Sequence, residues 1–271
     1  MLSKLGASIL LDKSAHASIY EGLLHSKASY QRFLHQDLDD LTKKLKKEQE
    51  NQVIISESIF SMSGSISNLG SIVRLAKTVS ADCIFDEAHA FGVVGPRGLG
   101  LVEQELLTQE QVPLRLIPFG KAFASQGAIV VGQKAWIDAL LQLAKPYIYS
   151  TALSPALASG LLETFEFIQK KGEARRAKLS TLISYFRQKN QQSALNFLDS
   201  HSPIQFLSLG DPHLALAYSA KLKEAGIFCQ ALRQPTVSKK NTGLRIILNY
   251  QHELFDLDYL FEQLEQVPGQ A

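Results

Sequence analysis

The stretch that decides the fold is Ala81–Gly100, ADCIFDEAHAFGVVGPRGLG, in which an apolar run ends on two acids, a histidine and a glycine-rich turn. Residues 81–85 are short and apolar, which is typical of a buried strand. In an open α/β sheet, ligands collect at the carboxyl ends of the strands. Asp86 therefore stands where a site residue is expected, although taken alone it could equally cap a helix.

Similar apolar runs recur on both sides of this stretch, and helix-like segments separate them. The strand-like runs are residues 8–12, 52–56, 114–119 and 127–132. The helix-like segments, whose apolar residues recur at intervals of three and four, are 18–28, 37–50 and 69–79. This alternation predicts an α/β domain with a mostly parallel sheet, buried strands and helices on both faces. We expect this major domain to cover residues 1–172.

The pattern changes near residue 154. Residues 154–188 are helical in pattern, and shorter strand-like runs follow at 202–209, 227–232 and 243–248. Helix-like segments at 213–226 and 254–267 alternate with these runs. The sequence therefore predicts a small C-terminal α+β domain over residues 173–271.

The composition favours small-molecule chemistry. The chain has 271 residues, and its net charge of +2 gives no electrostatic reason to expect nucleic acid or an anionic membrane as partner. Cys83 and Cys229 match no metal or redox spacing and are expected to be buried thiols in a reducing cytoplasm. No apolar run approaches the length of a membrane span, and residues 1–13 make a poor signal peptide. We expect a cytoplasmic protein without a metal site.

Lys121 is a second polar residue at a strand end. It follows the run LRLIPFG (114–120), in which Gly120 permits close backbone approach or an unusual turn. A single lysine is ordinarily a solvated surface residue. The functional interpretation depends on Lys121 and Asp86 together, because both are expected at the same edge of the sheet.

Six segments then carry a resemblance to a known family. DEAHAFGVVGPRGLG (86–100) resembles the Asp-x-Ala-His signature of the α-oxoamine synthases, which are fold-type I enzymes dependent on pyridoxal 5'-phosphate (PLP). FGKAF (119–123) resembles their cofactor-lysine segment. The other matches, in the family's order, are SAHASIYEG (14–22), SESIFSMSG (56–64), YIYSTALSPA (147–156) and RQPTV (233–237). The resemblance implies the fold-type I transferase fold, lacking the N-terminal part that holds the phosphate-cradling turn.

The resemblance also implies a set of cofactor-binding residues. They are Lys121, Asp86, His89, Ser61, His16 and Thr151. Lys121 is expected to bond to the cofactor aldehyde and Asp86 to face the ring nitrogen. His89 and Ser61 are expected to hydrogen-bond around the ring, His16 to stack on its face as a further catalytic residue, and Thr151 to reach the phosphate across a dimer interface. Without the resemblance, His89 would be a packed structural histidine and His16 a helix-surface residue.

Substrate recognition is expected from the C-terminal domain. By resemblance, Arg245 takes the carboxylate of the amino acid, for which a planar guanidinium is suited. Arg233 and Thr236 are expected to contact the acyl substrate, and His16 is expected to contribute as well. The alternatives are a snorkelling strand arginine for Arg245 and an ordinary proline-containing turn for the other two. Glu57 is expected to order the site without an assigned chemical role.

Members of the family join an amino acid to an acyl thioester with loss of carbon dioxide. The form of RQPTV resembles the branch that makes 8-amino-7-oxononanoate from L-alanine and a pimeloyl thioester in biotin biosynthesis, acting as a homodimer. Two alternatives stay open: a 2-amino-3-ketobutyrate CoA ligase, which uses glycine and acetyl-CoA, and a non-catalytic homologue that pairs with a full-length paralogue. The acyl carrier, coenzyme A or acyl carrier protein, is also open.

Overall fold

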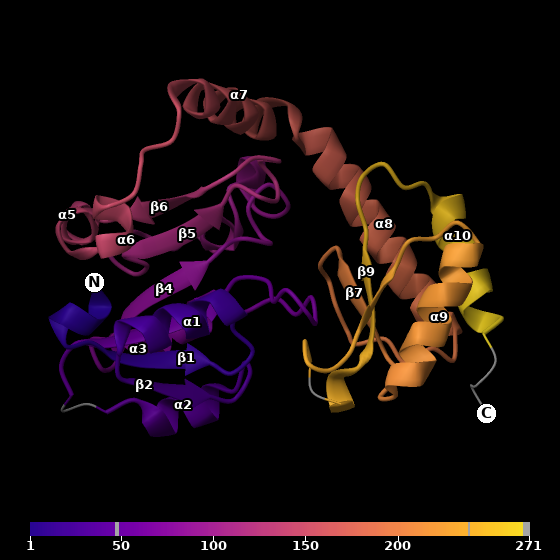
Figure 1. Ribbon diagram of the computed structural model, residues 1–271, viewed down its shortest axis with the longest axis horizontal. Helices are drawn as coiled ribbons and strands as arrows, with labels where there is room; N and C mark the ends of the chain where they lie inside the picture. Colours follow the sequence, from indigo (N-terminus) through magenta and orange to yellow (C-terminus); the bar gives the residue numbers. More distant parts are fainter. Residues whose placement is uncertain (47–48, 238, 268–271) are drawn as a thin grey trace. The chain divides into compact units, whose positions relative to one another are not determined.

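The computed structural model describes residues 1–46, 49–237 and 239–267, which form two compact units (Figure 1). Unit 1 comprises Met1–Phe60 and Ser67–Glu173. Unit 2 comprises Ser61–Ile66 and the chain from Ala174 onward. The division into a major domain over residues 1–172 and a small domain over residues 173–271 stays a prediction.

Unit 1 is built on a six-stranded sheet. Its strands, in sheet order, are β2 (Tyr30–Phe33), β1 (Ser8–Asp12), β3 (Gln52–Glu57), β4 (Asp82–Asp86), β5 (Leu114–Pro118) and β6 (Ala128–Gly132). The first five strands are parallel, whereas β6 is antiparallel to β5. The mostly parallel α/β sheet expected from the sequence is confirmed. The carboxyl ends of β1, β3, β4 and β5 consequently lie along one edge.

Helices flank this sheet, labelled in Figure 1 where there is room. They are α1 (Ala17–Ser26), α2 (Leu38–Lys44), α3 (Leu69–Lys77), α4 (Leu101–Gln104), α5 (Lys134–Leu143), α6 (Lys145–Ile148) and α7 (Pro155–Lys171). Short 3-10 turns occur at η1 (Leu2–Leu5) and η2 (Pro96–Gly98). Several helices begin at a side-chain cap: Asp37, Asn68 and Ser154 each accept a backbone N–H of the first turn.

The expected helix over 37–50 is too long. α2 ends at Lys44, where Leu45 turns extended, and residues 47–48 of the expected helix lie outside the described residues. Seven residues are a short helix, and acids in its first turn and lysines in its last turn match its macrodipole.

The core of unit 1 lies on both faces of the sheet. On one face, buried residues of β1, β3, β4 and β5 pack against α1 and α5; they are Ile9, Leu11, Val53, Ile55, Ile84 and Leu114. Leu10, Ile54 and Phe85, which alternate with these residues, are also buried on the other face. β1 and β3 are thus buried strands, as expected.

The expectation of a buried strand at residues 127–132 is wrong. Ala128, Ile129 and Val130 are exposed, with Ile129 at 42% and Val130 at 36%. β6 is the last strand of the sheet and pairs on one side only, with β5, in the part of the chain that the structure describes. An apolar sequence run does not distinguish an edge strand from a central one.

Unit 2 is a three-stranded antiparallel sheet packed on helices. The sheet order is β7 (Ile204–Ser208), β9 (Gly243–Ile247), β8 (Gln230–Leu232), and the helices are α8 (Glu173–Gln192), α9 (Pro212–Glu224) and α10 (Leu254–Glu265), with a 3-10 turn η3 (Lys239–Asn241) before β9. Their shared core includes Phe186, Leu207, Tyr218, Leu244 and Phe261. The helical pattern over 154–188 is interrupted at Gly172, so it forms two helices, α7 and α8. Cys83 and Cys229 are free and buried, as expected.

The segment Ser61–Ile66 belongs to unit 2 although both of its neighbours in the chain belong to unit 1. The hydroxyl of Ser200 donates to the carbonyl of Gly64 at 3.0 Å. Gly64 has φ +72, and a Cβ there would lie 2.1 Å from the carbonyl oxygen of Ile204. Only glycine fits this close approach. None of the described helices is both long and apolar enough to cross a bilayer.

Candidate active site

Ionisable side chains gather at the carboxyl edge of the unit 1 sheet. Asp12 ends β1, Glu57 ends β3, Asp86 ends β4, and Lys121 follows β5 by three residues. Glu57 and Asp86 are register partners on neighbouring parallel strands, so their side chains leave the same face of the sheet about 4.8 Å apart along the sheet. This edge therefore concentrates acids and a lysine in one place.

Asp86 is a half-buried carboxylate held in a turn. Its Oδ1 accepts the backbone N–H of Ala88 at 2.8 Å. Burial raises the pKa of Asp86 above its usual range, while the Ala88 N–H and the charges of Lys121 and His16 oppose that rise. Charge–charge interactions weaken with distance, so groups that influence the pKa of one carboxyl lie near it. Asp86, Lys121 and His16 therefore share one neighbourhood, although they lie far apart in the sequence.

The turn after β4 packs against the turn that carries Lys121. Gly92 has φ +80, and a Cβ there would lie 2.5 Å from the Cβ of Ala122. The rings of Phe91 and Phe123 stack with centroids 5.3 Å apart. Close packing of these two turns explains why the two motifs come together. Lys121 itself is exposed.

Glu57 is buried beside Asp86. It is 2% exposed, and within the described residues its Oε1 has no hydrogen-bond partner. Burial, followed by the neighbouring charge of Asp86, raises the pKa of Glu57 to about 8, against a backbone hydrogen bond from His16 and the charge of Lys121. An acid with such a pKa is mostly protonated at neutral pH.

Glu87 and Arg115 form a buried ion pair that the sequence interpretation missed. Glu87 is fully buried and accepts hydrogen bonds from Ser58 Oγ at 3.2 Å, from the N–H of Leu101 at 2.6 Å, from the N–H of Val102 at 3.0 Å, and from Arg115 Nε at 2.7 Å and Nη2. The pair thus ties the ends of β3 and β4, the glycine-rich turn and β5 together. An arginine inside the apolar run LRLIP was the available signal, since a charge in a buried strand needs a partner.

The structure places the remaining predicted residues of unit 1 as follows. His89 is half-buried in the turn after Asp86. His16 is exposed and caps α1, its Nδ1 accepting the N–H of Ser18 at 3.2 Å. Thr151 is exposed in the loop before α7. His16 therefore joins Asp86 and Lys121 at the sheet edge, whereas no described contact brings Thr151 to them.

Of the predicted substrate residues, Arg245, Arg233 and Thr236 lie in unit 2, whereas His16 lies in unit 1. Ser61, a predicted cofactor residue, is the first residue of the short segment of unit 2. Arg245 lies on the central strand β9, half-buried, with its Nε buried and without a hydrogen-bond partner in the described part of the chain. Burial lowers the pKa of Arg245. A desolvated guanidinium with an unused N–H is suited to an anion. Arg233 and Thr236 are exposed in the turn after β8.

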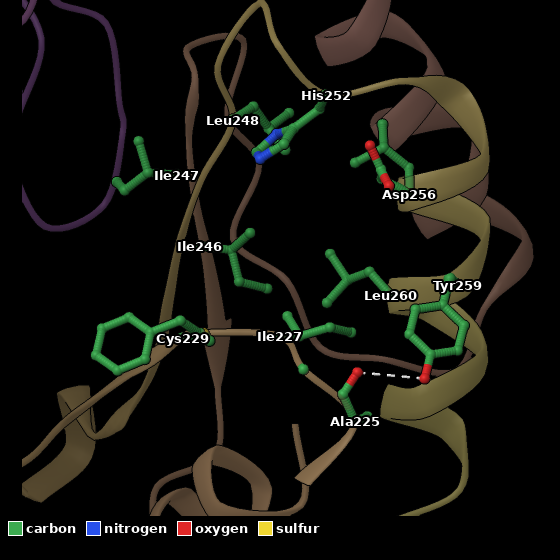
Figure 2. A pocket seen from close by; sticks show the side chains of 13 residues that line it. Ala225, Ile227, Cys229, Ile246, Ile247, Leu248, His252, Asp256, Tyr259 and Leu260 are labelled. Atoms are coloured by element: carbon green, nitrogen blue, oxygen red, sulfur yellow. Dashed lines mark hydrogen bonds between the residues drawn. The ribbon is translucent and has the colours of Figure 1, made fainter. Parts of the chain in front are cut away.

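Unit 2 also holds an apolar pocket, drawn in Figure 2. It has a volume of about 490 Å³ and is lined by residues that include Ile227, Cys229, Ile246 and Leu260. Its polar groups are already engaged: Tyr259 donates to the carbonyl of Ala225 at 3.3 Å, and Asp256 accepts the N–H of Glu253 at 2.8 Å. The sheet edge of unit 1, where Asp86 interacts electrostatically with Lys121 and His16, is the better candidate for chemistry.

Comparison with known proteins gives a consistent result. A family model described as aminotransferase class I and II matches residues 1–264. An 8-amino-7-oxononanoate synthase of Pseudomonas savastanoi pv. phaseolicola is 38% identical over 261 residues, which are 96% of this chain and 66% of that protein. The chain thus spans just under two thirds of the length of this curated relative.

Solved structures of similar fold cover the chain almost completely. An 8-amino-7-oxononanoate synthase from Francisella tularensis is 31% identical, with a TM-score of 0.85 over 96% of this chain and 75% of that one. A serine palmitoyltransferase from S. paucimobilis with bound PLP-myriocin aldimine is 25% identical, with a TM-score of 0.89 over 98% of this chain and 68% of that one.

Proposed function

Because the chain belongs to the aminotransferase class I and II family, we propose that it performs the condensation of L-alanine with a pimeloyl thioester, with loss of carbon dioxide, to give 8-amino-7-oxononanoate. The family membership and the fold-type I architecture inferred from the sequence are confirmed. The activity is supported by the synthases among the relatives. The observation that carries it is the convergence of Asp86 and Lys121 at one sheet edge.

The residues at this edge fit PLP as the cofactor. An exposed lysine amine and a half-buried carboxylate interact electrostatically there, as a ligand with an aldehyde and a ring nitrogen requires. The unpartnered oxygen of Glu57 shows that the edge is polar and incompletely satisfied by the protein itself. When bound, PLP supplies an electron sink for the bonds broken at the substrate α-carbon.

Each predicted cofactor residue has a proposed task. Lys121 would hold the cofactor through its aldehyde group, and as a neutral amine it would accept the α-proton of alanine. Asp86 holds a proton on the ring nitrogen, because its carboxylate stabilises the positive charge there. His89 and Ser61 hydrogen-bond at the ring, and His16 covers its face. Thr151 contacts the phosphate.

Substrate binding is assigned to unit 2. Arg245 binds the carboxylate of alanine; its Nε is buried without a hydrogen-bond partner among the described residues, and a guanidinium is suited to a two-pronged contact with a carboxylate. Arg233 and Thr236 contact the acyl substrate. Holding both reactants in place is a large share of such catalysis.

We also propose that the enzyme is a cytoplasmic homodimer. Large apolar side chains are exposed on unit 1 around Thr151, among them Tyr149 at 80% and also Tyr147, Leu153 and Leu162. Exposed apolar patches of this kind mark interfaces. Two free buried thiols suit a reducing compartment.

The test is a paired turnover assay. The purified chain, saturated with PLP, is given alanine with a pimeloyl thioester or glycine with acetyl-CoA, and Lys121→Ala serves as the inactive control. Formation of 8-amino-7-oxononanoate supports the proposal. Preference for glycine and acetyl-CoA would assign the chain to the ligase branch, and PLP-loaded protein without either product would overturn the proposed activity.

A further inference from the structure

We propose that Glu57 is a positioning residue that carries a proton at neutral pH, so that Asp86 is the single negative charge facing the cofactor. This inference rests on the proposed PLP function. It assigns a task to a carboxyl group for which the resemblance offered none.

Burial and backbone geometry place Glu57 directly beside Asp86. The two residues are register partners, and the N–H of Ser58 donates to the carbonyl of Asp86 at 2.9 Å. Glu57 lies at the end of β3, a strand buried along its whole length. The side chain of Glu57 therefore cannot move far from that of Asp86 without breaking the sheet.

Asp86 and Glu57 differ in the surroundings available to stabilise an ionised carboxylate. Asp86 is half-buried and accepts the N–H of Ala88 at 2.8 Å. Glu57 is almost completely buried, and its Oε1 has no donor among the described residues. Burying an ionised oxygen without a donor costs far more than burying a neutral acid. Where two adjacent carboxyl groups share one proton, the proton belongs on the one that is worse solvated.

Charged groups from every neighbouring element act on Glu57. Asp86 on β4 and Asp12 on β1 disfavour its ionisation, whereas Lys121 after β5 favours it, as does the hydrogen bond from the His16 backbone before α1. Asp12 is engaged elsewhere: its Oδ1 lies 3.0 Å from His35 Nδ1 and accepts the N–H of Ser14, and its Oδ2 accepts the N–H of Gln36. Burial decides the balance and raises the pKa of Glu57 to about 8.

The consequence is a site whose charge changes in alkaline solution. While Glu57 is protonated, Asp86 is the ionised member of this adjacent pair and faces the ring nitrogen alone. Above pH 8, a second carboxylate repels the first and the anionic cofactor. If only the protonated form binds PLP, its dissociation constant rises roughly tenfold between pH 7 and pH 9.

The test compares wild type with Glu57→Gln, which copies the neutral acid in shape and cannot ionise. PLP dissociation constants are measured by absorbance from pH 6.5 to pH 9. We expect wild type to lose PLP affinity about tenfold between pH 7 and pH 9 and Glu57→Gln to retain it. Glu110→Gln, at an exposed acid of the same unit, is the control and should keep the wild-type alkaline loss.

A second measurement needs no cofactor. Infrared spectra of the PLP-free protein should contain the carbonyl stretch of a protonated carboxylic acid at pH 7, which Glu57→Gln lacks and which disappears as the pH rises above 8. An ionised Glu57 at pH 7 overturns the proposal. If Glu57 is protonated at pH 7 but the PLP dissociation constants of wild type and Glu57→Gln depend on pH in the same way, the positioning role is overturned. Absence of PLP binding in both proteins at every pH defeats the proposed function and the positioning role with it, while the infrared result still decides the protonation state.

Discussion

The ion pair between Glu87 and Arg115 gives the sharpest stability prediction. Arg115→Met removes both guanidinium donors from Glu87 Oε2 and leaves the carboxylate fully buried with donors on Oε1 only. Breaking a buried pair by removing one partner costs about 3–5 kcal/mol. We expect a loss of this size in the free energy of unfolding of unit 1. In the double variant Arg115→Met/Glu87→Gln, the buried carboxylate that lost its arginine is replaced by a neutral amide. The double variant should therefore lose less unfolding free energy than the two single variants lose together, by about 1–3 kcal/mol.

The assay is urea unfolding followed by tryptophan fluorescence. Trp136 is the single tryptophan of the chain and lies on α5, partly buried against the unit 1 core, so its emission reports this unit. Lys134→Met is the matched control, because its ion pair with Asp138 is exposed and its loss should leave the unfolding midpoint unchanged. A loss below about 1 kcal/mol for Arg115→Met, or strict additivity in the double variant, would refute the reasoning.

Three further predictions concern other parts of the molecule. The pKa of Glu57 is about 8 in the folded chain and 4.5 for an ordinary glutamate, so the folded state binds a proton at Glu57 more tightly than the unfolded state does. This difference stabilises the fold fully below pH 4.5, and the stabilisation is lost as the pH rises through 8. Denaturant unfolding at a series of pH values should lose up to about 5 kcal/mol over this window in wild type, and Glu57→Gln should remove that slope. Gly64→Ala should destabilise unit 2 by more than about 2 kcal/mol, measured by circular dichroism, because its Cβ would overlap the Ile204 carbonyl oxygen. Gly210→Ala, at a similar φ of +67 but in open space, should cost only about 1 kcal/mol, and equal costs would contradict the packing argument. Arg245→Lys should raise the KM for alanine about tenfold with a smaller change in kcat, since lysine cannot form the bidentate contact; an unchanged KM would remove Arg245 from the substrate site.

Sequence patterns identified most of the unit 1 sheet but not its edges. The runs at 8–12 and 82–86 coincide with β1 and β4, because central parallel strands are continuously apolar. β2, YQRF, was missed because its middle residues are polar and exposed. The exposure of β6 depends on its place at the end of the sheet, which is a property of the tertiary fold rather than of the local sequence.

In the candidate site, too, some features could be predicted from the local sequence and others depend on the tertiary fold. Asp86 and Lys121 could be selected from the sequence because each follows a strand-like run and matches a motif. The Glu87–Arg115 pair joins residues 28 positions apart: an arginine in an apolar run indicates that a partner is needed, but the local sequence does not identify Glu87 as that partner. The protonation of Glu57 likewise follows from its burial beside Asp86. Local sequence therefore predicts which groups reach the sheet edge, whereas their ionisation and mutual support depend on packing.

The most direct test of the account asks which lysine captures PLP. The protein is incubated with PLP, reduced with borohydride, digested, and the modified peptide is mapped by mass spectrometry. Lys121, beside Asp86 at the sheet edge, should carry the pyridoxyl group at near-stoichiometric yield, while Lys134, a lysine of the same unit whose side chain is 87% exposed, should not. Saturating PLP that leaves Lys121 unmodified, or modifies both lysines equally, would contradict the assignment of the cofactor to this edge.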